Sequence, residues 1–360
     1  MSQKLSILLI VLMVPLAQGF TQSFLKVSYG DDLFAVGGGA RGLGMGGAQV
    51  ALVNDVTAGF WNPAGLFGIT NKQIAYMHSE RFGGVVAYDY GAFAMPLRNS
   101  EDVIGITFFR QGVDGIKNTL NAWDRDRDQP VANPEDHITE FSTADMALML
   151  SYATSLTPSL SWGTSLKLLY SRLGPFADGF GYSLDLGAMY RHEKFSAGVN
   201  LHNITTLMKL WSVNEDELEP LRDYFDDETL NEAFPQGQNE YTPPSMRIGI
   251  ASWRDFGEFK LTGSLDLLTH FENRRTYNIN LGPLSFQPHL GSEVSYKNLL
   301  FLRVGLTDMY TDQDSKFYAS PTLGGGFRMN KIFIDYGFSS FAGMSADLGY
   351  THRISAKISL

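Results

Sequence analysis

The chain has 360 residues, a formal net charge of −10 and no cysteine. This length fits two average globular domains or one large β-barrel. The negative charge excludes the basic surface that nucleic-acid binding requires, so we expect no nucleic-acid partner. The absence of cysteine excludes disulfides, thiol catalysis and thiolate metal sites. Outside the N-terminus no apolar run reaches the roughly 18 residues of a membrane-spanning helix, which excludes a helical membrane bundle.

The N-terminus has the pattern of a secretory signal peptide. Lys4 provides the positive charge, residues 5–16 form an apolar core, and Ala17-Gln18-Gly19 places small residues at the cleavage positions. We therefore expect residues 1–19 to be removed near Gly19 and the mature protein to leave the cytoplasm.

A glycine-rich segment follows at residues 37–48, where seven of twelve residues are glycine. That content is too high for a stable helix or an ordinary strand, and Asn62-Pro63-Ala64 then imposes a turn. Backbone of this kind needs surrounding structure to satisfy its hydrogen bonds. We predict that residues 20–70 form a plug or cap for a barrel formed by residues 71–360.

Two other interpretations of this segment are weaker. Gly42, Gly44 and Gly47 match the dinucleotide fingerprint G-x-G-x-x-G, which needs a strand before it, a helix after it and an acidic residue about 20 positions on. The residues before it are short and mixed, and no βαβ unit follows. A flexible linker is disfavoured because the segment also carries large apolar residues such as Met45 and Trp61.

Three short motifs resemble the start of the PorV/PorQ family of outer-membrane proteins: Gly-Ala-Arg-Gly-Leu-Gly-Met-Gly-Gly-Ala at 39–48, Asn-Asp-Val-Thr-Ala at 54–58 and Trp-Asn-Pro-Ala-Gly-Leu at 61–66. That family belongs to the FadL-like barrels, in which the N-terminal segment lies inside the barrel and also carries an Asn-Pro-Ala step. The resemblance implies a plug. Its motif residues are Arg41, Gly44, Gly46, Gly47, Trp61, Asn62, Pro63 and Ala64.

From about residue 72 onward the hydrophobic pattern has a period of two, which is typical of β-strands. Turn residues divide it into fourteen expected strands. An even number of strands, each near the ~9–11 residues that a tilted spanning strand needs, is characteristic of bacterial outer-membrane barrels. The expected strands are 72–78, 85–97, 102–110, 143–153, 159–172, 179–191, 194–201, 244–254, 258–270, 286–296, 299–306, 321–329, 331–338 and 345–360.

The alternation is clearest in the last strand and in strand 159–172. In the last strand one face carries Leu348, Tyr350, Ile354, Ala356, Ile358 and Leu360, and the other carries Asp347, Thr351, Arg353, Ser355, Lys357 and Ser359. In strand 159–172 the faces are Trp162, Leu166, Leu168 and Tyr170 against Ser161, Gly163, Ser165 and Lys167. A soluble sheet turns its apolar face to a core and a membrane barrel turns it to lipid, so alternation alone leaves both folds open.

The connection lengths decide between them. Alternate connections are all short, whereas the others hold every long insertion: 111–142, 202–243, 271–285 and 307–320. Short turns on one rim and long extracellular loops on the other are the pattern of an outer-membrane barrel. We predict an all-β fold, a 14-stranded antiparallel transmembrane barrel with an N-terminal plug, located in the outer membrane. Leu360 departs from the aromatic residue that commonly ends such barrels.

The first long insertion carries Asp124, Asp126 and Asp128, with Glu135 at the twelfth position from Asp124. This spacing is similar to an EF-hand calcium loop, but the glycine at its sixth position is missing and helical flanks are absent. We therefore expect a solvated loop and no metal site. In the second insertion Leu218, Leu221, Phe225, Leu230 and Phe234 recur at roughly helical spacing, which indicates one or two short amphipathic helices.

By this register several charged side chains face the lumen: Lys167, Asp185, Arg247, Asp266, Glu293, Arg303, Asp335, Asp347 and Arg353. Both signs are present, so we expect buried pairs across the lumen and between the wall and Arg41 of the plug. No spacing selects a catalytic carboxylate pair, and the sequence contains neither H-E-x-x-H nor G-x-S-x-G. We expect no catalytic site and no cofactor, and therefore not an enzyme.

The resemblance implies a type IX secretion accessory that binds the C-terminal signal domains of exported proteins, with the loops 111–142 and 202–243 contacting cargo and secretion components. The alternative is a FadL-like channel that takes up fatty acids or other hydrophobic molecules, with a ligand pocket near Phe60, Trp61 and Phe67. A barrel with only a structural role is the third. Cargo binding predicts a large ordered outer surface and a blocked lumen, whereas uptake predicts an apolar pocket and a kink in the wall.

Overall fold

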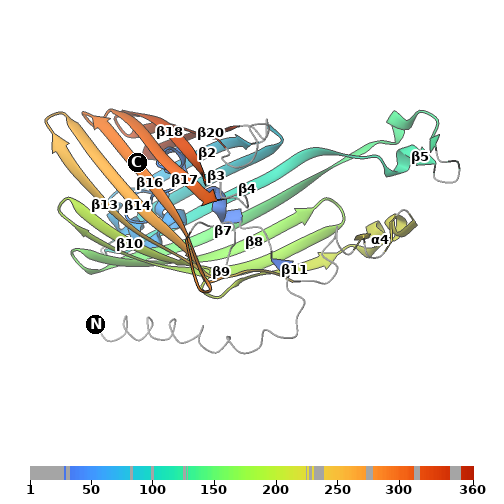
Figure 1. Cartoon of the computed structure of the whole chain (residues 1–360), viewed down its shortest axis with the longest axis horizontal. Helices are drawn as coiled ribbons and strands as arrows, with labels where there is room; N and C mark the ends of the chain where they lie inside the picture. Colours follow the sequence, from blue (N-terminus) through green and yellow to red (C-terminus); the bar gives the residue numbers. More distant parts are fainter. Residues whose placement is uncertain are drawn as a thin grey trace.

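The computed structural model shows a closed barrel of fourteen antiparallel strands (Figure 1). It describes residues 28–29, 33–81, 84–98, 101–124, 127, 129–223, 225–226, 229–230, 239–272, 279–311, 317–340 and 350–360. The wall strands are β2 (Gln73–Arg81), β3 (Val86–Pro96), β4 (Val103–Asn118), β7 (Thr139–Thr157), β8 (Leu160–Leu173), β9 (Ala177–His192), β10 (Phe195–His202), β13 (Ser245–Phe256), β14 (Phe259–His270), β16 (Leu284–Tyr296), β17 (Leu300–Thr311), β18 (Phe317–Met329), β19 (Ile332–Ser340) and β20 (Tyr350–Ser359). The predicted number of strands is confirmed.

The barrel closes between its first and last strands. Each wall strand pairs antiparallel with its neighbour in chain order, and β2 pairs with β20 from Gln73↔Ser359 to Glu80↔His352. Closure removes the unpaired sheet edges that would otherwise be exposed in a membrane. The predicted signal peptide and residues 341–349, including Asp347 and Leu348, lie outside the described residues.

The wall has the inverted polarity of a membrane barrel. In β8, Ser161, Ser165 and Lys167 are buried toward the lumen, while Leu168 is exposed on the outer face. The described part of β20 follows the same rule, with Thr351 and Arg353 buried. Polar side chains inside and apolar side chains outside are what a surrounding bilayer requires. Among the described residues, no helix is long and apolar enough to span a membrane.

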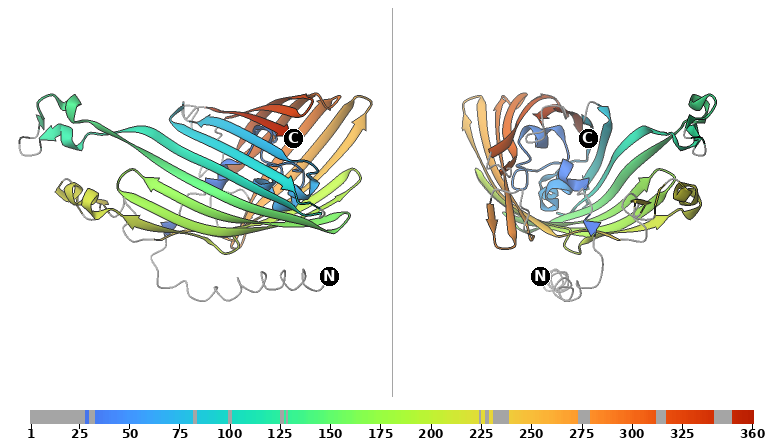
Figure 2. Two further views of the ribbon diagram at one scale, coloured as in Figure 1. Left: turned by 180° about the vertical axis from the view of Figure 1, so that it is seen from behind. Right: turned by 45° about the vertical axis from the view of Figure 1, so that its right-hand side comes forward.

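The N-terminal segment fills the lumen (Figure 2). It contains four short helical elements joined by turns: η2 (Leu33–Val36), α2 (Ala40–Gly44), α3 (Ala58–Trp61) and η3 (Pro63–Gly68). A shorter piece, β1 (Ser28–Tyr29), pairs in parallel with β12 (Glu240–Thr242) next to the wall. The glycine-rich segment is therefore a packed plug. Gly42 lies in α2 against Trp61 of the plug and Gly44 lies in α2 against Gly324 of the wall, which is not the strand–loop–helix setting of a dinucleotide site.

Two arms project beyond one rim of the barrel (Figures 1 and 2). The first continues β4 and β7, which pair as far as Asn118↔Thr139, and ends in η5 (Leu120–Ala122), β5 (Trp123–Asp124), β6 (Gln129–Pro130) and η6 (Pro134–His137). The second contains β11 (Leu207–Val213), α4 (Glu215–Leu218) and η7 (Glu219–Asp223). The predicted strand ends at 110 and 143 were wrong, because the ladder hydrogen bonds between β4 and β7 continue past the length that spans the membrane.

The second arm has its own small apolar cluster. Leu218, Leu221 and Leu230 are buried with Phe176, and Phe141 packs against them. The expected short helices are present as α4 and η7, but Phe225 is exposed and Phe234 lies outside the described residues. A third hairpin extension is formed by β15 (Ile279–Leu281), which pairs with the start of β16.

Candidate functional site

The plug is seated on glycines of the wall. Nine wall glycines face the lumen where a Cβ would collide with or crowd a neighbour, and at each of them that neighbour includes a plug residue. We call this set the glycine belt: Gly105, Gly163, Gly187, Gly198, Gly249, Gly291, Gly305, Gly324 and Gly337. Around the wall from β4 to β19, their plug contacts run from Leu66 through Asn62, Val50 and Met45 to Ala40. The plug therefore circles the lumen in the direction opposite to the strand order.

The belt consists mostly of pairs on adjacent strands. Gly291 pairs with Gly305, and a Cβ on them would lie 2.4 Å from the Met45 carbonyl oxygen and 2.3 Å from the Gly46 nitrogen. On the plug side, Gly46 has a φ of 62° and a Cβ there would lie 2.6 Å from the Leu290 carbonyl oxygen. Backbone thus meets backbone with no room for a side chain on either partner. Glycine is required here for space in the wall and for conformation in the plug.

The Asn-Pro-Ala step forms a corner that is bonded in three directions. The Asn62 Nδ2 donates to the carbonyl oxygens of Val50 (2.8 Å) and Ala188 (3.2 Å), and its Oδ1 accepts from the Ala64 nitrogen. Pro63 occupies the first position of η3, where its missing N–H costs nothing. The Ala64 carbonyl oxygen accepts from Ser161 of β8 at 3.0 Å. The corner therefore ties the plug both to itself and to the wall.

Trp61 joins the two halves of the plug. Its Nε1 donates to the Gly38 carbonyl oxygen at 2.8 Å, and its ring packs so closely on Gly42 that a Cβ there would lie 2.6 Å away. Phe60 beside it packs edge-on against Tyr90 and Phe109 of the wall. These rings pack against one another and the wall, where the uptake hypothesis expected a ligand pocket, and Phe67 packs against the same cluster.

Buried charges connect the plug to three wall strands, β16, β17 and β19. The Arg41 guanidinium donates two hydrogen bonds of 3.0 Å to Glu293. Glu293 also accepts from Arg303 at 2.6 Å, and Arg303 donates in turn to Asp335 at 2.7 Å. Although burial opposes the charge, Glu293 raises the pKa of Arg41 above its ordinary value. The expected pairing of Arg41 with a lumen acid is present, and bidentate geometry makes this the strong form of the interaction.

A second carboxylate holds the next turn of the plug. Asp266 of β14 accepts from the backbone nitrogens of Gln49 (2.8 Å) and Val50 (2.9 Å). Arg247 donates to the Gly47 carbonyl oxygen at 2.9 Å. On β20, Arg353 donates to the carbonyl oxygen of Val36 at 2.9 Å. Most of the charges assigned to the lumen therefore bind plug backbone or one another, as the alternation predicted.

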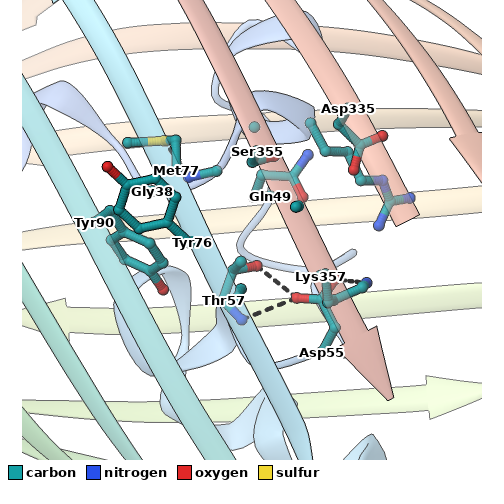
Figure 3. A pocket seen from close by; sticks show the side chains of 15 residues that line it. Gly38, Gln49, Asp55, Thr57, Tyr76, Met77, Tyr90, Asp335, Ser355 and Lys357 are labelled. Carbon is teal, nitrogen blue, oxygen red and sulfur yellow. Dashed lines mark hydrogen bonds and ion pairs between the residues drawn. The ribbon is translucent and has the colours of Figure 1, made fainter. Parts of the chain in front are cut away.

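Figure 3 shows a small polar cavity between the plug and strands β2, β3, β19 and β20. Its volume of about 20 Å³ suits a single water molecule and excludes an organic ligand. Lys357 donates to Asp55, which also accepts from the Thr57 hydroxyl at 2.6 Å (Figure 3). Burial alone would raise the pKa of Asp55, but the Lys357 charge and these hydrogen bonds hold it well below its usual value. Asp55 is therefore ionised at neutral pH.

The wall is interrupted in its seventh strand. β10 ends at His202 and β11 begins at Leu207, and three residues of β9 (183–185) face six residues (202–207) across the break. On the other side Pro243 and Pro244 separate β12 from β13, and proline donates no ladder hydrogen bond. Asn203 and Thr206 have positive φ values of 53° and 59°. From the sequence, this stretch was expected to be the start of the insertion 202–243, so the break was not predicted.

A buried polar cluster lies next to this break. The Lys167 ammonium lies 2.7 Å from Asp185, and both side chains are 1% exposed. Asp185 also accepts from the Asn203 backbone nitrogen at 2.9 Å and contacts the His202 ring at 3.1 Å. On the plug side the Phe34 ring lies 4.1 Å from the Lys167 nitrogen. The sequence contains no signal that separates this break from the start of a loop, because the positive φ of Asn203 and the hydrogen bond that its Oδ1 accepts from Lys167 exist only in the folded barrel.

Metal chemistry has no support in the described part of the chain, where no group of three His, Asp or Glu side chains could hold an ion. Asp124 instead accepts from the Arg127 backbone nitrogen, while Asp126 and Asp128 lie outside the described residues. None of the plug motif residues approaches an arrangement of nucleophile and base. The site is a seat for the plug, with a break in the wall beside it.

Comparisons with known proteins identify solved structures with a similar architecture. Neither the protein-family models nor the curated proteins contain a match to the sequence. Among solved structures, the CymD monoaromatic hydrocarbon channel is 13% identical with a TM-score of 0.53, covering 90% of this chain and 98% of that one. The toluene transporter TodX of Pseudomonas putida is 12% identical with a TM-score of 0.52, covering 90% and 97%. The chain therefore shares the fold of these two proteins, a closed barrel of fourteen antiparallel strands.

Proposed function

We propose that the protein is an outer-membrane conduit for small hydrophobic molecules, which leave the lumen sideways through the break at residues 203–206. The proposal rests on this break, because an uninterrupted wall would separate the lumen from the surrounding lipid. An axial route is unfavourable, since the plug rests directly on the wall along the glycine belt and the cavity beside β2 and β20 has a volume of only about 20 Å³. A lateral route needs only local movement at residues with few ladder bonds.

The surroundings of the break suit an apolar ligand. Leu33 of the plug, Leu169 of β8 and Leu207 of β11 are buried in one cluster, with Phe34 packed against it. An apolar molecule that displaces such contacts keeps a dry, apolar lining, whereas an ion would lose its hydration without compensation. The names of the structural neighbours, a monoaromatic hydrocarbon channel and a toluene transporter, support the same ligand class for this chain. We therefore propose fatty acids or aromatic hydrocarbons as substrates.

The test removes the break while keeping the barrel. Deleting Ile204 and Thr205 shortens the unpaired stretch by two residues, so the inward and outward faces of β11 are preserved. We expect uptake of radiolabelled toluene or oleate by cells that depend on this barrel to fall to the level without the protein. Deleting Ala132 and Asn133 in the first arm is the matched control and should leave uptake unchanged. Full uptake by the 204–205 deletion would refute the proposal.

A second candidate is a carrier of exported proteins, as the PorV/PorQ resemblance implies. The two arms favour it. Residues 111–142 carry seven acidic and three basic residues, and residues 202–243 carry ten acidic and two basic residues, whereas the chain as a whole has a net charge of −10. The negative charge is thus concentrated on projecting elements (Figure 2). Such an acidic surface suits a protein partner better than a small apolar molecule.

Affinity purification separates the two candidates. The tagged protein is isolated from detergent-solubilised outer membrane, and co-purifying proteins are identified by mass spectrometry. A carrier would retain exported proteins that share a C-terminal signal domain, and would lose them when residues 114–142 are replaced by a short turn. A conduit would retain only lipid or substrate, and the same arm replacement would leave that content unchanged.

A further inference from the structure

The outer face of the wall contains an apolar hollow of about 680 Å³ that crosses β10, β13, β14, β16, β17 and β18. The labelled strands among these lie side by side in Figure 1. A hollow of this volume is in the range of binding sites for small ligands, whereas the outer face of a barrel is generally convex. It is separate from the break in the seventh strand and from the plug seat.

A row of small side chains produces the hollow. Ser252 pairs with Gly263, and Gly263 pairs with Ser292, so three small outward residues stand next to each other on β13, β14 and β16. A Cβ placed on Gly263 would meet nothing within 4 Å. Phe195, the partner of Ser252, closes one end of the row, and Val304, the partner of Ser292, closes the other. The row is therefore a trough that runs across the strands.

Large apolar residues border the trough on both sides. Two residues away along the strands, the row on one side is Ile250, Leu265, Leu290 and Leu306. The row on the other side begins at Arg254 on β13 and continues with Leu261, Val294 and Leu302. The seven apolar residues are exposed, by between 38% and 72%. On the lumen side of the same strands, Gly291 and Gly305 carry no side chains and rest on the plug. The wall is thus a single backbone layer thick beneath the trough.

The floor of the trough offers no free hydroxyl proton. The Ser252 hydroxyl donates to the Lys194 carbonyl oxygen at 3.0 Å, and the Ser292 hydroxyl donates to the Thr262 carbonyl oxygen at 3.3 Å. Both hydroxyl donors are therefore used by the barrel itself. A ligand group that needs a hydrogen-bond donor would not find one on these serines and would lose its hydration, so the trough favours a hydrocarbon.

We propose that this trough binds one acyl chain of a membrane lipid. The surrounding outer wall already faces lipid, so the occupant comes from the bilayer. From Phe195 on β10 to Val304 on β17 there are four strand spacings, or about 19 Å at roughly 4.8 Å each. This length accommodates the tail of one leaflet, which spans about 15 Å. The occupant lies inclined to the membrane normal, because the strands themselves are tilted.

The test fills the trough. Gly263→Leu places a side chain on its floor without contact to the plug, and Gly91→Leu on β3 is the matched control, because a Cβ there also meets nothing within 4 Å. Both proteins are purified in detergent, titrated with dipalmitoyl phosphatidylethanolamine and examined by native mass spectrometry. We expect the wild type and Gly91→Leu to retain one lipid, and Gly263→Leu to bind it about tenfold more weakly, since a Leu displaces several methylenes of the chain. Equal retention by all three proteins would overturn the proposal.

A second variant and a second measurement distinguish the loss of lipid binding from misfolding of the barrel. Ser292→Leu fills the same trough from β16, and the shift in electrophoretic mobility between unheated and heated samples checks that each barrel is folded. If the wild type is a dimer and Gly263→Leu is a monomer with no lipid in either, the trough is an interface between two copies and the proposal is wrong. Lipid retention is measured without transport, so it stands or falls independently of uptake.

Discussion

The plug seat and the projecting arms are stabilised in opposite ways. In the seat, elements far apart in the chain meet backbone to backbone: Gly44 lies against Gly324, and Arg41 is paired with Glu293. In the second arm a few nearby segments bury Leu218 and Leu221 against Phe176, and most charged side chains around them are exposed. The seat depends on every strand that contacts it, whereas the arm depends on one small cluster to which, among the described residues, only Phe141 and Phe176 from neighbouring hairpins contribute.

This difference indicates which regions of the protein tolerate substitutions. A barrel with a packed lumen has no room for adjustment, because each added atom meets backbone that is fixed by ladder hydrogen bonds on both sides. An arm outside the membrane opens locally at low cost, and local opening leaves the rest of the structure intact. The surroundings of the plug are therefore rigid because the plug packs against fixed wall backbone. The arms are freer because their contacts are mostly local.

The largest effect is expected in the glycine belt. Gly305→Val should destabilise the folded barrel by about 3 kcal/mol or more, because its side chain would displace the Gly46 backbone that lies 2.3 Å from the Cβ position. Urea unfolding in detergent micelles, followed by the fluorescence of the tryptophans, measures the loss. Gly91→Val, on the outer face, should change stability by less than about 0.5 kcal/mol. Similar losses for the two variants would remove the distinction between seat and outer wall.

The buried Asp55–Lys357 pair comes next. Asp55→Asn should cost about 3 kcal/mol at pH 7, because Lys357 would stay in the lumen without its counter-charge. The folded-state pKa of Asp55 is lowered, so the pair stabilises the protein above the unfolded-state pKa of about 3.9, and this contribution is lost as the pH falls below it. Thermal unfolding from pH 7 to pH 2 should progressively narrow the difference in stability between wild type and variant at the acidic end. A constant difference at all pH values would contradict this assignment.

A matched pair of leucines compares the two regions directly. Leu66 in the plug and Leu218 in the second arm are both fully buried. Leu66→Ala should lower the free energy of unfolding of the barrel by about 2–5 kcal/mol. Leu218→Ala should leave that quantity within about 0.5 kcal/mol of wild type but speed proteolysis at residues 214–223, which only limited digestion followed by mass spectrometry detects. A global loss from Leu218→Ala would show that arm and barrel unfold together.

The strands were predictable because their signal is local. Alternation over ten or so residues reports which side of a wall each side chain occupies, and β8 and β20 obey it. The arms were predicted less well, since β4 and β7 continue to Asn118 and Thr139 through residues without an apolar face. The parts of β4 and β7 that lie outside the membrane need no row of apolar side chains facing lipid. The break at 203–206 was also missed, because an unpaired stretch in a wall and the start of a loop look alike in a sequence.

The sequence by itself determined a plugged, fourteen-stranded barrel and the lumen face that carries its charges, because strand period, turn residues and connection lengths are properties of neighbouring positions. Only the tertiary structure decided which partners meet: Glu293 as the acid for Arg41, the glycine belt as the seat of the plug, and the trough formed by Ser252, Gly263 and Ser292. Each of these depends on the register between strands. A shift by one residue exchanges the two faces of a strand, so contacts of this kind exist only once the barrel has closed.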